Sequence, residues 1–256
     1  MRYLRPILQR GAVSPKDALA FCDPSYWFTH CYVFTREFSV GRISVDELLP
    51  EERERLTVPR APIAGLKFQK PLIMGILNTT PDSFSDGGQF DQFDTATRHA
   101  TQMQIQGADL IDIGGESTRP GADYVESGDE IARTAPKIKM LSDTLSIPMS
   151  IDTRKAPVAR AAIDAGAQIV NDVSGFTFDP DLAPYVAQNN IPVCIMHAQG
   201  DPKTMQDNPK YEHVLLDVFD FLEDQIARLE TLGLSRRQII ADPGIGFGKS
   251  LSHNLQ

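Results

Sequence analysis

The sequence has no apolar run long enough to cross a membrane, and it has few basic residues for its length. Because a membrane-spanning helix needs about 18 consecutive apolar residues, we expect no such helix and no membrane partner. The N-terminus lacks an apolar core of signal-peptide length, which favours a cytoplasmic location. The chain carries 25 Lys and Arg against 34 Asp and Glu, a net charge of −9. This balance argues against nucleic acid as a main partner, because phosphate-binding surfaces need clustered cations.

Cysteine is also scarce. The three cysteines, Cys22, Cys31 and Cys194, are too few for a disulfide framework, so free thiols in a reducing compartment are expected. Cys22 and Cys31 lie near His30, but their spacing matches no common zinc pattern. We therefore assign these residues no metal-binding role.

The chain is long and apolar enough for one large α/β domain with a smaller appendage, at 256 residues and 41% apolar content. Residues 1–70 form the predicted appendage, a small N-terminal extension of unknown role. Within it, residues 26–40 are rich in aromatic and β-branched residues and predict one or two strands. Residues 46–56 predict a short charged helix, and the proline-containing residues 57–65 predict a linker.

From residue 71 the pattern alternates between apolar strand-like runs and helical segments. This alternation with short connections predicts parallel strands joined by right-handed crossovers. Either a doubly wound open sheet or a (β/α)8 barrel fits the alternation. The predicted strands are residues 72–77, 109–113, 147–151, 167–170, 192–195 and 238–241, and the helices between them are residues 94–106, 128–145, 156–165, 181–188 and 211–232.

Every predicted strand ends in a polar or chemically useful residue. In a (β/α)8 barrel all carboxyl ends meet at one face, so these side chains would surround one cavity. An open sheet would concentrate ligands at one switch point instead, so the pattern favours the barrel. The residues, in chain order, are Asn78, Asp112 to Glu116, Asp152, Asn171 with Asp172, His197, and Asp242.

A closed barrel needs eight strands, and the sequence accounts for about six βα units. We therefore expect residues 71–256 to form an incomplete (β/α)8 barrel, truncated before strands 7 and 8. On this interpretation the chain is a fragment of a longer protein.

Two loops and three strand ends carry the predicted chemistry. The loop of residues 78–88 carries an amide, hydroxyls and carboxylates, which suit a hard cation or a polar substrate. The loop of residues 113–123 adds two glycines, hydroxyls and Arg119, a natural partner for phosphate or carboxylate. Asp152, Asn171 and Asp242 could accept N–H groups from a flat nitrogen heterocycle. Their alternative role is to cap the helices that follow them.

The glycine-rich segment of residues 242–250, DPGIGFGKS, is neither a Walker A loop nor a dinucleotide fingerprint, because its glycine spacing is wrong for both. It leaves a loop with Phe247 and Lys249 available to the cavity. His197 follows a strand, and we interpret it as a core histidine bonded to backbone, with no part in proton transfer.

Taken together, these segments closely resemble the dihydropteroate synthases, a family of pterin-binding (β/α)8 barrels. The resemblance extends from about residue 71 to the end of the sequence, in the family order. The matching segments are LNTTPDSFSDGG (77–88), GADLIDIGGESTRPGA (107–122), SIDTRK (150–155), IVNDVSG (169–175), IMHAQGDPKTMQ (195–206) and DPGIGFGKSLSHN (242–254).

The resemblance implies a reaction that joins 6-hydroxymethyl-7,8-dihydropterin diphosphate to p-aminobenzoate and releases diphosphate, by ionisation of the pterin diphosphate. It implies Mg²⁺ as the cofactor, with Asn78 as the metal-site residue, and a homodimer for the full-length protein. By the same resemblance, the pterin-binding residues are Asp152, Asn171, Asp242, Met196 and Lys249, the catalytic residues are Asp82, Asp86 and Arg119, and the p-aminobenzoate and diphosphate loops contribute Ser117, Thr118, Arg119, Pro120 and Phe247.

Two other functions stay open: a methyltransferase that binds methyltetrahydrofolate, and a non-catalytic pterin-binding protein. The loops of residues 81–88 and 116–121 count against the methyltransferase, which does not need them. The family's Lys after strand 7, and its Arg and His after strand 8, have no counterpart in this sequence. We therefore expect this chain alone to be inactive or nearly so.

Overall fold

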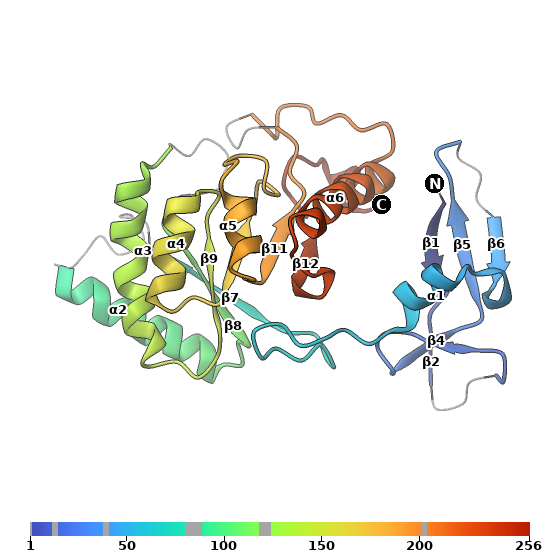
Figure 1. Cartoon of the computed structure of the whole chain (residues 1–256), viewed down its shortest axis with the longest axis horizontal. Coiled ribbons are helices and arrows are strands. Elements are labelled where there is room, and N and C mark those ends of the chain that lie inside the picture. Colours follow the sequence, from blue (N-terminus) through green and yellow to red (C-terminus); the bar gives the residue numbers. More distant parts are fainter. Residues whose placement is uncertain (1, 12–14, 38–40, 80–88, 118–123, 201–203) are drawn as a thin grey trace. The chain divides into compact units, whose positions relative to one another are not determined.

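The computed structural model describes residues 2–11, 15–37, 41–79, 89–117, 124–200 and 204–256, with side chains undescribed at 89–94. The chain divides into two compact units (Figure 1). The first unit is Met1–Pro62 with Lys67–Pro71, and the second is Ile63–Leu66 with Leu72–Gln256. In the described residues, no helix is both long and apolar enough to span a bilayer.

The first unit is built from two small antiparallel sheets. One has the order β1 (Tyr3–Pro6), β5 (His30–Phe34), β6 (Gly41–Ser44), and the other has the order β2 (Gln9–Arg10), β4 (Tyr26–Phe28), β3 (Leu19–Ala20). One or two strands were expected within residues 26–40, and the structure has two, β4 and β5. Phe28, Cys31, Val45 and Leu48 form a small separate core.

The predicted charged helix of residues 46–56 begins later than expected. Residues Val45–Glu47 form a 3₁₀ turn, and α1 (Pro50–Thr57) starts at the proline. Pro50 lacks an N–H and fits the first turn of a helix, where that group has no intrahelical partner. The Glu52 carboxylate accepts the Leu49 N–H at 2.9 Å and pairs with Arg2, which fixes this start.

The second unit is a six-stranded parallel sheet with helices between the strands. The strands are β7 (Met74–Asn78), β8 (Leu110–Gly114), β9 (Met149–Asp152), β10 (Ile169–Asp172), β11 (Val193–Met196) and β12 (Ile239–Asp242). The helices are α2 (Gln89–Ile105), α3 (Ser127–Ser142), α4 (Ala156–Ala165), α5 (Leu182–Gln188), α6 (Val214–Thr231) and α7 (Leu251–Asn254). In space the strands follow their order in the chain, from β7 to β12.

This sequential order decides between the two architectures that the sequence left open. A doubly wound sheet reverses its strand order at a switch point, and this sheet has no reversal. Right-handed crossovers that always move in one direction place their helices on one face, as in a (β/α)8 barrel. In Figure 1, α3, α4 and α5 lie side by side over the strands. The fold is therefore of the predicted barrel type, with six βα units.

The two faces of the sheet differ in character because successive strand residues point to opposite faces. One face is apolar and fully buried beneath the helices, whose small residues Ala100, Ala159 and Ala162 allow close packing. The other face, called the polar face below, carries polar residues together with buried apolar ones such as Leu110 and Ile169. The buried apolar strand residues include Leu77, Ile111, Ile113, Ile151, Val170, Val193 and Ile195, and the polar face carries Asn78, Asp112, Ser150, Asp152 and Asn171.

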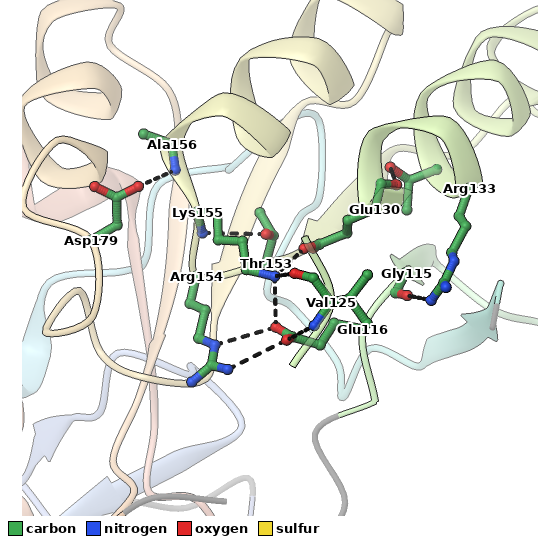
Figure 2. Close-up of polar contacts among 11 residues, drawn as sticks. Gly115, Glu116, Val125, Glu130, Arg133, Thr153, Arg154, Lys155, Ala156 and Asp179 are labelled. Atoms are coloured by element: carbon green, nitrogen blue, oxygen red, sulfur yellow. Dashed lines mark hydrogen bonds and ion pairs between the residues drawn. The ribbon is translucent and has the colours of Figure 1, made fainter. Parts of the chain in front are cut away.

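A network of buried charges ties the loop after β8 to α3 and to the start of α4 (Figure 2). The Lys155 ammonium lies 2.7 Å from Glu130 Oε2 and 3.1 Å from Glu116 Oε2, and it donates to the Val125 carbonyl at 2.6 Å. Arg154 Nε donates to Glu116 Oε2 at 3.2 Å. Burial alone would raise the pKa of Glu116, but the Val125 N–H and the two cations outweigh it and lower that pKa.

We expect Lys155→Met to lower the free energy of unfolding by about 3–5 kcal/mol, because two buried carboxylates would lose the cation between them. Urea unfolding followed by circular dichroism at pH 7 measures this. Arg236→Met is the matched control, since Arg236 pairs with Glu223 and Glu230 but is 38% exposed, and its loss is expected within about 1 kcal/mol. Equal losses for the two variants would contradict the assignment.

Candidate functional site

Four neighbouring strands bring one residue each into a row across the polar face. Asn78 pairs with Gly114, Gly114 with Asp152, and Asp152 with Asn171 in the strand register. Residues paired in this way point to the same face, so three of the predicted site residues lie side by side. Asp242 pairs with Met196, two residues beyond Cys194, the partner of Asn171. It therefore lies on the same face, one level nearer the carboxyl ends.

Gly114 keeps the middle of this row open. A Cβ atom at this position would lie 3.4 Å from Asp152 Oδ2 and 3.8 Å from Asn78 Oδ1. The two polar side chains therefore flank a position without a side chain. A flat ligand can approach the strand backbone there.

Asp152 is the least satisfied polar group of the row. Its Oδ1 is buried and has no hydrogen-bond partner among the described residues. Burial raises the pKa of this carboxyl well above its ordinary value, and the nearby charges of Asp112 and Asp172 raise it further. A group in this condition gains from a ligand that brings N–H donors.

Asp112 lies one level deeper on the same face, and the sequence assigned it no role of its own. Its Oδ2 accepts the Asn171 Nδ2–H at 3.0 Å, and its Oδ1 accepts the Ser150 hydroxyl at 2.5 Å. Burial raises its pKa, while these two bonds oppose the rise. The sequence could have indicated its position, because Asp112 precedes Gly114 by two residues and so shares its face, but not its bond to Asn171.

Asp172 points away from the site face and binds the loop that follows its strand; it does not cap the next helix, which begins at Leu182. It is fully buried on the helix side and accepts the backbone N–H groups of Ser174 at 2.7 Å and Phe176 at 2.8 Å. Burial raises the pKa of Asp172 to about 6. Asp242 also accepts a nearby backbone N–H, from Gly244 at 2.7 Å. Asp172 therefore shapes its loop, and Asp242 both shapes a loop and lies on the site face.

Lys249 holds two loops together. Its buried ammonium donates to the carbonyls of Gly244 at 2.9 Å, Phe247 at 3.0 Å and His197 at 3.3 Å, and it lies 2.9 Å from His197 Nδ1. Burial lowers the pKa of Lys249 to about 8. The loops approach so closely that a Cβ on Gly244 would lie 2.0 Å from the His197 carbonyl oxygen. Lys249 was predicted to be available to the cavity; its bonds are instead made within these loops.

His197 is buried, as expected for a core histidine, with Lys249 as its side-chain partner. Burial, followed by the charge of Lys249, lowers the pKa of His197 to about 4. The ring is therefore neutral near pH 7, and its Nδ1 accepts the Lys249 proton. Phe221 packs edge-on against it with ring centroids 5.0 Å apart. His197 is therefore a buried, uncharged part of the contact between the two loops.

A cavity of about 290 Å³ opens beside the carboxyl ends of β8 to β12. Three predicted site residues, Ser117, Met196 and Phe247, line it. Arg154 and Phe178 line it as well, and they were not predicted. The Arg154 guanidinium lies 4.0 Å from the centre of the Phe178 ring, and Arg154 is paired with Glu116. The cavity thus combines apolar walls with one cation whose charge is balanced.

Asp82, Asp86, Thr118, Arg119 and Pro120 lie outside the described residues. Asn78, the residue predicted to bind metal, is exposed at the end of β7. Within the described part of the chain, no three His, Cys, Asp or Glu side chains form a metal cluster. Asn78 offers one oxygen ligand beside Asp152, which suits a Mg²⁺ ion that takes its other ligands from substrate oxygens and water.

The comparisons agree with this geometry. The family model described as "Pterin binding enzyme" matches residues 74–256. A dihydropteroate synthase from Synechocystis sp. is 46% identical over 200 residues, which are 77% of this chain and 69% of the relative. The Escherichia coli dihydropteroate synthase is 44% identical over 190 residues, which are 74% of this chain and 67% of the relative.

Solved structures give the same result. The Yersinia pestis dihydropteroate synthase with a sulfonamide drug complex has a TM-score of 0.71 and 42% identity, over 77% of this chain and 72% of that chain. The Xanthomonas albilineans enzyme in complex with 7,8-dihydropteroate has a TM-score of 0.67 and 38% identity, over 77% and 70% of the two chains. The chain therefore belongs to the pterin-binding enzyme family and, within it, to the dihydropteroate synthases.

Proposed function

We propose that this chain binds 6-hydroxymethyl-7,8-dihydropterin diphosphate and p-aminobenzoate, and that it takes part in their condensation to 7,8-dihydropteroate and diphosphate. One observation carries the proposal: the buried Asp152 carboxylate has an oxygen without a partner among the described residues, beside the Asn171 amide at the end of the neighbouring strand. Family membership supports it, as do related dihydropteroate synthase structures determined in the presence of pteroic acid and with 4-aminobenzoic acid.

The polar row suits a pterin because a pterin edge is rich in N–H donors. Asp152 and Asn171 supply acceptors on adjacent strands, and Asp242 adds a carboxylate one level nearer the carboxyl ends. Met196 pairs with Asp242 in the register and supplies an apolar surface for the ring. Lys249 acts on this site indirectly, by holding the loop after β12 through the carbonyls of Gly244 and Phe247.

The reaction needs no protein nucleophile. The bond between the exocyclic carbon of the pterin and the diphosphate oxygen breaks, and the diphosphate leaves with the electron pair. The pterin ring stabilises the resulting cation, the aryl amine nitrogen attacks it, and the nitrogen then loses a proton. The chain's part is to orient the substrates and exclude water, for which the apolar cavity walls of Phe178, Met196 and Phe247 are suited.

The second substrate is a flat aromatic carboxylate, and the cavity beside the strand ends suits it in size and chemistry. Phe247 would contact the ring, and Ser117 lies at the mouth of the second loop. The roles predicted for Asp82, Asp86 and Arg119 in catalysis, and for Thr118 and Pro120 in the aryl amine site, rest on the family resemblance.

Mg²⁺ would offset charge on the leaving diphosphate when it is bound. Asn78 would hold it through its side-chain oxygen, next to the row that positions the pterin. We also propose, from the resemblance, a homodimeric full-length protein located in the cytoplasm.

Ordered binding, measured by titration calorimetry with this chain, tests the proposed function. Dihydropterin diphosphate should bind alone, and p-aminobenzoate should bind only once diphosphate is present. A protein that binds pterin without this order would be the non-catalytic alternative. Binding of methyltetrahydrofolate in place of the pterin diphosphate would support the methyltransferase and overturn the proposal.

Asp152→Asn should weaken the binding of dihydropterin diphosphate at least tenfold and should stabilise the fold. The raised pKa means that ionised Asp152 destabilises the folded state, so its contribution to stability is greatest below the unfolded pKa and is lost as pH rises. Calorimetry and thermal unfolding at pH 7 measure the two effects. The exposed Asp181→Asn is the control and should change neither.

In the wild type, pterin affinity should rise with pH as Asp152 ionises, and a flat profile would count against its role.

Lys249→Met should lower the free energy of unfolding by about 1–3 kcal/mol, because three loop carbonyls lose a shared donor. It should also weaken the binding of p-aminobenzoate, since Phe247 would no longer be held at the cavity. Urea unfolding and calorimetry in the presence of diphosphate measure these effects, with the exposed Lys210→Met as the control. Unchanged aryl amine binding in a destabilised variant would refute the positioning of Phe247.

Asn78→Ala should raise the Mg²⁺ concentration needed for half-maximal binding of dihydropterin diphosphate by about tenfold, since one oxygen ligand is lost. The measurement is calorimetry over a series of Mg²⁺ concentrations, with the Mg²⁺-free titration as the baseline. A variant with the wild-type Mg²⁺ dependence would remove Asn78 from the metal site.

A further inference from the structure

The Asn171 amide has two chemically different ends, and the end that faces the ligand decides what the site can bind. Its Nδ2 donates to Asp112 Oδ2 at 3.0 Å. Among the described residues, no donor reaches its Oδ1. Asn171 is half-buried, next to Asp152 in the strand register. The amide oxygen is thus the end available at the site.

Asp112 permits only one orientation of the Asn171 amide. Its side chain is only 4% exposed, and its other oxygen accepts the hydroxyl of Ser150, which is completely buried. An ionised carboxylate has acceptors only, so turning the Asn171 oxygen toward it would set two acceptors against each other. The same turn would leave a buried carboxylate oxygen without a donor, which is costly in a protein interior.

We propose that Asp112 is a positioning residue for pterin recognition: it fixes the orientation of the Asn171 amide, so that Asn171 and the ionised Asp152 present only acceptors to the ligand. This inference rests on the proposed function and deepens it. Asp112 lies one level below the row and acts through Asn171. The site then selects heterocycle edges with neighbouring N–H donors and rejects edges that present carbonyls or bare ring nitrogens.

Exchanging the two side chains tests the orientation. In Asp112→Asn/Asn171→Asp, the new amide can donate to the new carboxylate and still accept the Ser150 hydroxyl, so one carboxylate oxygen remains for the ligand. Asn171→Asp alone sets two carboxylates against each other. At low pH a proton shared between the two carboxylates lets residue 171 present an acceptor oxygen to the ligand. At high pH that proton is lost and the two carboxylates repel each other. Asp112→Asn alone removes the constraint, because the new amide can accept the Ser150 hydroxyl and donate to a turned Asn171 oxygen, which leaves the Asn171 Nδ2 facing the ligand.

Calorimetry with dihydropterin diphosphate gives the readout at pH 6 and pH 8. We expect Asn171→Asp to weaken binding tenfold or more at pH 8 and much less at pH 6. The double variant should bind within about threefold of wild type at both pH values, whereas Asp112→Asn should weaken binding about tenfold at both. Wild-type affinity in a folded Asp112→Asn variant would contradict the inference. If Asn171 offered its N–H to the ligand, the carboxylate introduced by Asn171→Asp could not replace that donor. A folded double variant that is no better than the single variant at pH 8 therefore overturns the inference.

An experiment on the wild-type chain decides the question without a variant that must fold. In protein labelled with ¹⁵N-asparagine, the Asn171 side chain should show a slowly exchanging Nδ2 proton in the absence of ligand. Exchange at the rate of a free amide would overturn the orientation. Because this experiment uses no ligand, it stays decisive even if the wild-type chain fails to bind dihydropterin diphosphate, a result that would count against the proposed function instead.

Discussion

The arrangement of the second unit depends on one constraint: all crossovers between its parallel strands run in the same direction. The helices therefore cover one face of the sheet, and the apolar strand residues of the main core cluster point to that face. The opposite face can carry polar groups, because successive strand residues alternate between the two faces. The site follows from this division, because its carboxylates and amide occupy the positions that the core does not need.

These polar groups oppose the stability of the fold that positions them. Burial raises the pKa values of Asp112, Asp152 and Asp172, so each folded carboxyl holds its proton more tightly than an unfolded one. Asp172 regains stability from two backbone N–H groups, and Asp112 from Ser150 and Asn171. Asp152 has no such compensation at its buried oxygen from any described residue. Asp112 and Asp172 therefore have their hydrogen bonds within the protein, whereas Asp152 has an oxygen that can accept one from a ligand.

Much of this fold could be predicted from the sequence, since apolar runs and glycine stops mark each βα unit. The predicted strands began up to two residues too early and ended one or two residues too early, because a polar residue such as Asn78 was taken as the start of a loop. In a sheet with one polar face, such a residue can be the last residue of the strand. The charged helix near residue 50 was placed too early for a different reason, since Pro50 fixes its start.

The contacts between side chains of distant segments were harder to predict. Asp112 meets Asn171 across 59 positions, and Lys249 meets His197 across 52. Residue spacing indicates a shared face but not a hydrogen bond between two particular atoms. Lys249 was therefore assigned to the cavity, although its donors bind loop carbonyls. It was easier to predict that Asn78, Asp152 and Asn171 lie side by side, because the parallel register alone brings strand ends together.

The charges on the site face also agree with the proposed chemistry. A reaction that passes through a pterin cation needs negative potential at the ring and has no use for a nearby uncompensated cation. Arg154 and Lys155 are paired with Glu116 and Glu130, and the neutral His197 adds no charge. The Lys249 ammonium is directed at loop carbonyls and at His197. Asp152 is left with a buried oxygen that no described donor reaches. The electrostatic feature that weakens the folded chain is thus the one that would stabilise a cation held beside it.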